Sequence, residues 1–204
     1  MTSFSRRVLA TSVLVALLAG CGGHGRGGGA VSAPSRGTSP STSGAGSTVH
    51  ALRRSVPVRL QIPAIGVDTP VIRLGLAADG TVQVPPVTAH DPAGWYGHSP
   101  TPGQTGPSVI LGHVTVGSYG DGVFRHLERL HRGDRIVTRL ENGTAAVFTV
   151  SSVRTVAKAD FPAADVYGDV DRPELRVITC GGSRGGDGYL DNVIVFATLG
   201  STAS

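Results

Sequence analysis

Short hydrophobic segments alternate with turn residues over most of the chain. From about residue 55 onward, apolar runs of about four to eight residues are separated by Gly, Pro and Asp, which is the pattern of β-strands joined by turns. The pattern predicts eight strands, at residues 58–62, 71–74, 82–84, 108–111, 135–140, 146–150, 175–179 and 192–197.

Two local patterns complete the predicted fold. Asn142-Gly143 lies between the fifth and sixth strands and is a strong signal for a β-hairpin. Residues 123–131 alone show helical spacing, because Val123, Phe124, Leu127 and Leu130 share one face. Eight strands and one short helix predict a mostly β fold, either a closed barrel or a sandwich.

The first 20 residues have the organisation of an export signal. Arg6 and Arg7 precede an apolar run at residues 8–20, which is short for a membrane-spanning helix. The run ends in Leu18-Ala19-Gly20-Cys21, which resembles the bacterial lipobox and implies that Cys21 is lipidated. A plain secretory signal and an uncleaved anchor are the alternatives. In each case the rest of the chain works outside the cytoplasm.

A polar linker follows the signal. Residues 21–54 begin with Cys21 and consist largely of Gly, Ser, Ala, Thr and Pro. Such a segment buries too little apolar surface to offset its ordering entropy, so we expect a disordered tether. Residues 55–200 then form the one folded domain.

Composition excludes several classes of protein. The chain has 204 residues, which is enough for one ordinary domain with tails. Its two cysteines exclude a disulfide-built scaffold and a four-cysteine zinc site. The net charge of +4 comes from scattered basic residues, so we expect no nucleic-acid partner. The sequence indicates no cofactor and no metal site.

Cys180 and His113 are the candidate reactive side chains. Cys180 directly follows a predicted buried strand and precedes Gly181-Gly182, where a substrate backbone can approach closely. His113 likewise follows a strand and a glycine. Taken alone, Cys180 can also be interpreted as a buried, inert cysteine, and His113 is one of seven histidines.

A set of motifs in a fixed order gives these residues a family context. The chain resembles the sortase family, and within it the actinobacterial class called class F. The resemblance covers residues 57–199 and rests on Leu60-Gln-Ile-Pro-Ala-Ile-Gly-Val67, Pro70-Val71, Gly94-Trp-Tyr96, Leu111-Gly-His113, Gly122-Val-Phe124, Gly133-Asp134 and Leu175-Arg-Val-Ile-Thr-Cys180.

The resemblance implies an eight-stranded sortase barrel and a cysteine transpeptidase. Cys180 would attack a Leu-Pro-x-Thr-Gly-like sorting signal after Thr and form a thioacyl intermediate, with His113 as general acid and base. Thr179 matches the family's Thr and is expected in the substrate site. Ile178 shares the Cys180 face by strand alternation and would line the substrate groove.

One position departs from the family pattern. Sortases carry an arginine on the strand after the Cys loop, and here Leu190 occupies that position. Arg184, four residues after Cys180, is the expected catalytic substitute. Arg176 is the second candidate and an expected substrate-binding residue.

The resemblance also implies the partners. They are surface proteins with a C-terminal sorting signal, a peptidoglycan-precursor or pilin amine, and the membrane, contacted through the N-terminal lipid or signal anchor. The expected location is the outer face of the cell membrane of an actinobacterial-type Gram-positive cell. Two alternatives stay open: a sortase-fold hydrolase that uses the same residues, and a degenerate non-catalytic surface lipoprotein, which Leu190 suggests.

Overall fold

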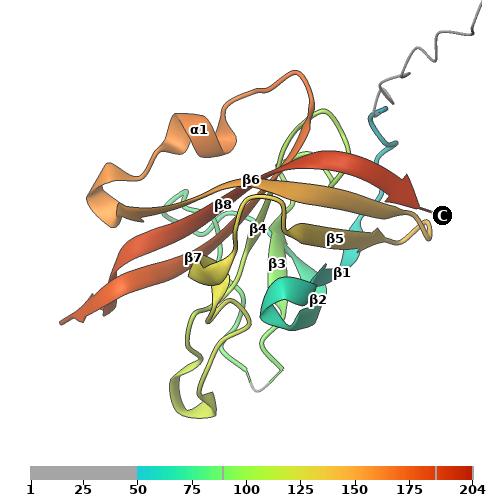
Figure 1. The fold of residues 1–204 in the computed structure, drawn as a ribbon. Coiled ribbons are helices and arrows are strands. Elements are labelled where there is room, and N and C mark those ends of the chain that lie inside the picture. The colour runs from blue at the N-terminus through green and yellow to red at the C-terminus, as the bar shows by residue number, and fades with distance from the viewer. Residues whose placement is uncertain (1–49, 89, 187, 204) are drawn as a thin grey trace, which may run out of the picture. The chain divides into compact units, whose positions relative to one another are not determined.

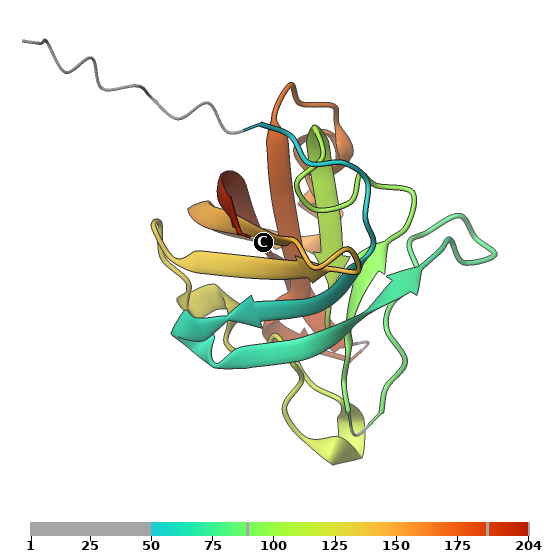
Figure 2. The ribbon, with the colours of Figure 1, turned by 90° about the vertical axis from the view of Figure 1, so that its right-hand side faces the viewer.

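Eight strands close into a barrel within residues 50–88, 90–186 and 188–203, the part of the chain that the computed structural model describes. Their order around the barrel is β1-β2-β3-β4-β7-β8-β6-β5 (Figures 1 and 2). The strands are β1 Pro57–Ile62, β2 Val67–Leu74, β3 Ala93–Tyr96, β4 Gly106–Leu111, β5 Arg135–Leu140, β6 Ala145–Ala157, β7 Pro173–Gly185 and β8 Gly188–Ala203. The closed barrel confirms the mostly β fold expected from the sequence.

Two pairs in this barrel are parallel, β2 with β3 and β4 with β7, and the other pairs are antiparallel. A parallel pair brings equivalent strand ends to the same edge of the sheet. The residues that follow β4 therefore lie beside the second half of β7. Figure 1 shows β7 and β8 continuing together as a long hairpin.

The hairpin predicted at Asn142-Gly143 is confirmed and joins β5 to β6. Gly143 adopts a φ of 84°, a left-handed conformation that glycine adopts without steric cost. The Asn142 side chain accepts a hydrogen bond from the backbone N–H of Thr144, at 3.1 Å.

One predicted strand does not form, and one observed strand was not predicted. Residues 82–84 form no strand, and Val82 makes only an isolated bridge with Leu76, because Pro85 and Pro86 follow directly and lack the N–H groups of a ladder. The missing strand is β3, whose small residues hid it. Gly94 is needed there, since a Cβ atom would lie 2.3 Å from Leu74 Cδ1.

The helix predicted at residues 123–131 is also wrong: turns and a 3₁₀-helix at Leu127–Arg129 take its place. The buried side chains of this segment are Phe124, Leu127 and Leu130. They recur every three residues, which is the 3₁₀ period. The described α-helix is α1, Ala163–Tyr167, and the other 3₁₀-helices are Pro63–Ile65, Gly117–Tyr119 and Lys158–Asp160.

The barrel has one core inside and a second apolar cluster outside. Trp95, Phe124 and Phe148 are the largest fully buried side chains of the interior. The outer cluster contains Val109 on β4, Ile178 on β7 and Val166 on α1. The segment between β6 and β7 therefore packs on the outer face of the strands that carry the candidate site.

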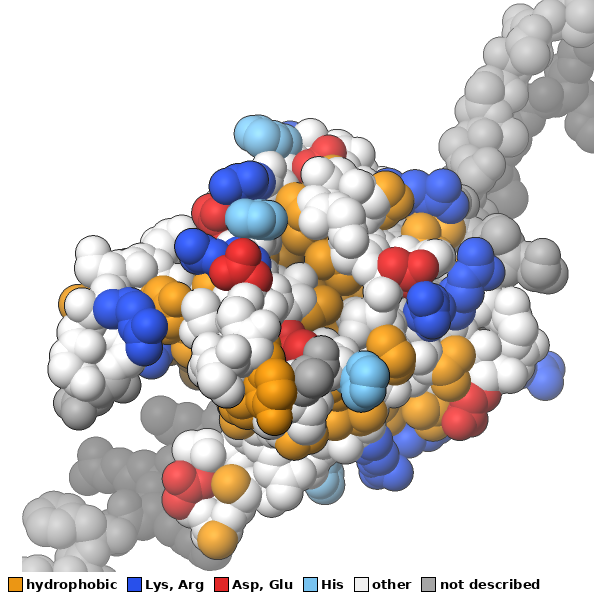
Figure 3. Space-filling model, turned by 90° about the horizontal axis from the view of Figure 1, so that it is seen from below, with side chains coloured by type: hydrophobic (Ala, Val, Ile, Leu, Met, Phe, Trp, Pro, Cys, Tyr) orange, Lys and Arg blue, Asp and Glu red, His pale blue; other side chains and the backbone are white. Residues whose placement is uncertain are grey.

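The predicted signal at residues 1–20, Cys21 and the linker as far as residue 49 lie outside the described residues. In the described ranges, no helix is both long and apolar enough to cross a membrane. The face seen from below carries interspersed positive and negative side chains around a hydrophobic group (Figure 3).

Candidate active site

Cys180 lies within β7 rather than at its end, because the strand runs on to Gly185. Its thiol is free and half-buried. Cys180 is paired with Asn192 of β8, and Thr179 and Ile178 precede it on the buried part of the strand. The nucleophile candidate therefore occupies the point where β7 leaves the barrel surface.

Backbone and side-chain contacts join the segment that carries His113 to the strand that carries Cys180. The parallel register pairs Leu111 with Ile178, so His113 and Cys180 each lie two residues beyond a paired position. The intervening Gly112 donates its N–H to Ile178 O, at 3.1 Å, and accepts the Thr179 hydroxyl at 2.8 Å. Thr179, expected in the substrate site, is thus buried and ties β4 to β7.

Gly112 also allows the site to pack closely. A Cβ atom at this position would lie 2.4 Å from the Phe124 ring. The ring of Phe124 is fully buried beneath the segment that carries His113. The Gly-His motif therefore has a steric reason besides its chemistry.

The half-buried imidazole of His113 is held by the connection between β2 and β3. Its Nε2 lies 2.7 Å from Pro85 O. A carbonyl oxygen only accepts hydrogen bonds, so Nε2 carries a proton in this contact.

Sequence analysis missed Asp91, a buried acid on the same connection. Its Oδ2 atom accepts the backbone N–H of Val123. Burial raises the pKa of the Asp91 carboxyl above its usual range, while the Val123 N–H and the positive charge of His113 act in the opposite direction. The sequence signal was weak, because only the tertiary fold brings residues 91, 113 and 123 together.

Arg184 and Leu190 lie on the β7–β8 hairpin beyond Cys180. Gly181 pairs with Asp191 and Arg184 pairs with Tyr189, so a bulge in β7 lies opposite Leu190. The bulge needs Gly182, where φ is 70° and a Cβ atom would collide with the Asp191 carboxylate.

The bulge changes which face each side chain occupies. By pairing and alternation, Leu190 shares the face of Asn192 and Cys180, whereas Arg184 shares the face of Tyr189. Arg184 is exposed, and its guanidinium carbon lies 5.3 Å from the centroid of the Tyr189 ring.

Arg176 is enclosed by protein groups. Its side chain is 4% exposed and forms an ion pair with the buried Glu174, at 2.6 Å. Its Nε donates to Asp165 O, at 3.1 Å, and the guanidinium lies over Phe196. Of these groups, Phe196 belongs to the second apolar cluster.

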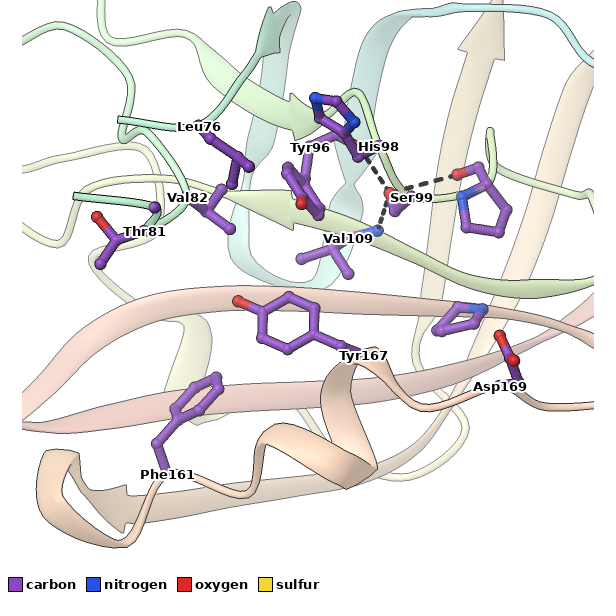
Figure 4. Close-up of a pocket in the computed structure, with 13 residues that line it drawn as sticks. Leu76, Thr81, Val82, Tyr96, His98, Ser99, Val109, Phe161, Tyr167 and Asp169 are labelled. Carbon is purple, nitrogen blue, oxygen red and sulfur yellow. Dashed lines mark hydrogen bonds between the residues drawn. The ribbon is translucent and has the colours of Figure 1, made fainter. Parts of the chain in front are cut away.

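A cavity of about 580 Å³ opens on the outer face of the same strands (Figure 4). Tyr96 and Val109 come from β3 and β4, and Phe161 and Tyr167 come from the segment around α1. The rings of Tyr96 and Tyr167 meet edge to face, with centroids 6.2 Å apart. Burial and the neighbouring Tyr96 raise the pKa of the Tyr167 phenol, so it remains a hydrogen-bond donor at neutral pH.

Ile178 connects this cavity with Cys180. Its side chain is 5% exposed and packs in the cluster that Val109 and Tyr96 also join. Ile178 and Cys180 share the outer face of β7 by alternation. An extended ligand on this face would thus run from an aromatic cavity, over Ile178, to the thiol.

Comparisons with known proteins identify the family of the sequence and proteins with a similar fold. The sequence matches the Sortase domain family over residues 60–200. No curated protein matches it. The SrtA sortase from Actinomyces oris is 23% identical with a TM-score of 0.54, covering 74% of this chain and 82% of that one. Sortase A from Corynebacterium diphtheriae is 20% identical with a TM-score of 0.56, covering 73% and 62%. Sortase A from Listeria monocytogenes is 15% identical with a TM-score of 0.53, covering 74% and 90%. At these identities the structural likeness shows the fold.

Proposed function

The chain belongs to the sortase family of cysteine transpeptidases, and we propose that it cleaves a Leu-Pro-x-Thr-Gly-like sorting signal between Thr and Gly. The Thr carboxyl is then joined to an amine of the cell wall or of a pilin subunit. The observation that supports this proposal is the pair of hydrogen bonds between Gly112, which precedes His113, and the residues Ile178 and Thr179, which precede Cys180.

The proposed reaction has two steps. The Cys180 thiolate attacks the carbonyl carbon of Thr, the C–N bond breaks, and the imidazolium of His113 gives a proton to the departing Gly amine. The resulting thioester is attacked by the acceptor amine while neutral His113 takes the proton of that amine. The Cys180 thiolate leaves, and one amide bond has replaced another.

The cavity beside α1 is the proposed site for the residues that precede the scissile bond. Part of its wall is aromatic, with Tyr96, Tyr167 and Phe161 turned towards one another, and aliphatic and polar side chains complete the lining (Figure 4). The aromatic part suits the apolar and proline side chains of a sorting signal. Ile178 supports the backbone between this cavity and Cys180.

Product analysis tests the proposed function and its alternatives. The full-length protein is incubated with a library of sorting-signal peptides, with and without an amine acceptor, and the products are identified by mass spectrometry. A transpeptidase gives the amine-linked peptide when the acceptor is present. Release of the free Thr carboxylate under both conditions identifies a hydrolase, and intact peptides identify a non-catalytic binding protein.

We expect Arg184→Ala to lower kcat by roughly 10²–10³-fold, as loss of one oxyanion donor does. Arg184 lies on the strand face opposite Cys180, so the proposal requires the end of the β7–β8 hairpin to rearrange when substrate binds, which releases the guanidinium from the Tyr189 ring and brings it to the carbonyl oxygen. Arg184→Lys rescues little, because an ammonium does not reproduce the planar fork of a guanidinium. Single-turnover kinetics with a cleavable peptide measure the change.

Two further variants control this test. Leu190→Arg in the Arg184→Ala background should restore part of the rate, because Leu190 shares the Cys180 face. Arg176→Ala should instead lower stability by about 2 kcal/mol, since it removes one of the two ion-pair partners of the buried Glu174, and Arg172 remains at 2.7 Å. A normal rate in Arg184→Ala with a 10²-fold loss in a folded Arg176→Ala protein contradicts the role of Arg184. If neither change matters, backbone N–H groups after Cys180 are the donors.

Sortases are extracytoplasmic cell-surface enzymes, and we propose that lipidated Cys21 anchors this one. The lipobox-like residues 18–21 close the apolar run of the signal. Globomycin, which inhibits lipoprotein signal processing, should then leave an unprocessed precursor in the producing cell. A free Cys21 thiol on an intact N-terminus, detected by mass spectrometry, would show an uncleaved anchor instead.

A further inference from the structure

Asp91 occupies an unusual backbone position immediately before β3. It has a φ of 30°, the one positive value among the non-glycine residues that the structure describes. Its backbone is fixed on both sides, since its N–H donates to Thr88 O at 3.2 Å and its carbonyl accepts the Thr69 hydroxyl at 3.4 Å. The side chain is only 8% exposed. Asp91 is therefore a buried acid held in one orientation.

The Asp91 carboxylate is hydrogen-bonded to the segment 122–124, which is itself hydrogen-bonded to the backbone of His113 and Val114. Its Oδ2 atom accepts the N–H of Val123. The residues on either side of Val123 are paired with the His113 segment: Phe124 N donates to His113 O at 2.9 Å, and Gly122 N donates to Val114 O at 3.0 Å. The approach is close, because a Cβ atom on Gly122 would lie 2.4 Å from His113 O.

The second carboxylate oxygen supplies charge without a hydrogen bond. Oδ1 of Asp91 is buried and has no partner among the described residues. The charge of His113 acts to lower the pKa of the Asp91 carboxyl, against the larger effect of burial, which raises it. A buried negative charge near an imidazole favours its protonated form.

Other titratable groups surround this pair. His90 on the same connection, with Asp121, Arg125 and His126 between β4 and β5, lines a cavity of about 370 Å³ that Asp91 also lines. Asp121 and Arg125 form an exposed ion pair, at 3.1 Å. Asp91 differs from these neighbours because it is buried and accepts a hydrogen bond from Val123, whose own neighbours are paired with the His113 segment.

We propose that Asp91 is a positioning residue for His113, fixing its backbone through Val123 and stabilising its imidazolium form by charge. This inference rests on the proposed role of His113 as the general acid. It makes the connection between β2 and β3 part of the catalytic apparatus, since the same connection supplies Pro85 O to His113 Nε2. The acid form of His113 is the one that protonates the departing amine.

Asp91→Asn separates charge from backbone support, because the amide oxygen still accepts the Val123 N–H. In the full-length protein we expect kcat/KM at neutral pH to fall roughly tenfold, which is less than the loss of about 10²–10⁴-fold expected when the general acid itself is removed. The loss should be in kcat, and the alkaline limb of the pH profile should move to lower pH. Asp91→Glu, which keeps the charge, should retain the position of that limb.

Asp121→Asn is the matched control. It removes an exposed negative charge that lines the same cavity, and solvent screens such a charge. We expect its pH profile to coincide with that of the unmodified protein. If Asp91→Asn and Asp121→Asn both leave the profile and kcat unchanged, the positioning role of Asp91 is wrong.

A second measurement needs no substitution at Asp91, so it tests the proposal even if Asp91→Asn does not fold. The ¹³C signal of the Asp91 carboxyl is followed by NMR as pH is varied, in the full-length protein and in His113→Gln. We expect a second step in the Asp91 titration that disappears in His113→Gln. Absence of that step overturns the inference. By contrast, an active His113→Gln enzyme overturns the proposed function and leaves the electrostatic coupling as measured.

Discussion

Cys180→Ala should abolish turnover of a sorting-signal peptide and leave the barrel folded. Without the sulfur no thioester forms, so we expect the rate to fall by at least roughly 10³-fold, with residual catalysis limited to binding and oxyanion stabilisation. Folding should be little affected, because the thiol is half-buried and β7 is held on both sides by β4 and β8. Peptide cleavage followed by chromatography gives the rate, and circular dichroism gives the melting temperature.

Cys21→Ser is the matched control for this variant. Cys21 is the other cysteine of the chain, and its loss should leave the rate in solution unchanged. If Cys180→Ala continues to cleave the peptide at a substantial fraction of the normal rate, a thioacyl mechanism at Cys180 is excluded. If Cys21→Ser abolishes cleavage, the nucleophile has been assigned to the wrong cysteine.

His113→Gln should lower kcat by about 10²–10⁴-fold with a much smaller change in KM, the range expected when a general acid–base group is lost. Glutamine can still donate an N–H group to Pro85 O, so the variant tests proton transfer more than the position of the loop. Steady-state kinetics with the same peptide measure both constants.

His131→Gln provides the comparison for His113→Gln. His131 is exposed and follows the 3₁₀-helix at Leu127–Arg129. We expect its kinetics to be normal. A loss of less than tenfold in His113→Gln would assign the proton transfers to another group, and the first to examine would be Tyr167 in the neighbouring cavity.

A strand rich in β-branched residues and followed by a clear turn was predictable from the sequence, and β3 was not. Residues 135–140 were predicted with their observed bounds, because Ile136, Val137 and Thr138 favour a strand and the Asn142-Gly143 turn follows closely. Ala93–Tyr96 contains alanine and glycine, which have low strand propensity. It forms β3 because Gly94 allows β3 to lie close to Leu74, a reason that exists only in the folded barrel.

The length of the strands also depends on tertiary pairing. The sequence predicted strands at residues 175–179 and 192–197, but β7 and β8 extend to Gly185 and from Gly188. The added residues include several glycines, which disfavour strands locally. They are extended because each strand supplies the hydrogen-bond partners of the other.

The residues of the candidate site also differ in whether the sequence alone could identify them. Cys180 and His113 could be found because each follows an apolar run, and the runs that precede them belong to β4 and β7, which form a parallel pair. Asp91 could not be found, since its contact with Val123 joins residues 32 positions apart through a loop with no periodic pattern. The face of Arg184 was equally hidden, because it depends on the bulge at Gly182.

Intact-protein mass spectrometry of the full-length chain with a sorting-signal peptide shows directly whether Cys180 forms a thioacyl intermediate. We expect a covalent adduct that adds the mass of the peptide up to and including Thr, less one water. It should map to Cys180 after digestion and be released by hydroxylamine, as a thioester is. Cleaved peptide formed with no adduct on Cys180, or an adduct that maps to another residue, would show that Cys180 is not the nucleophile.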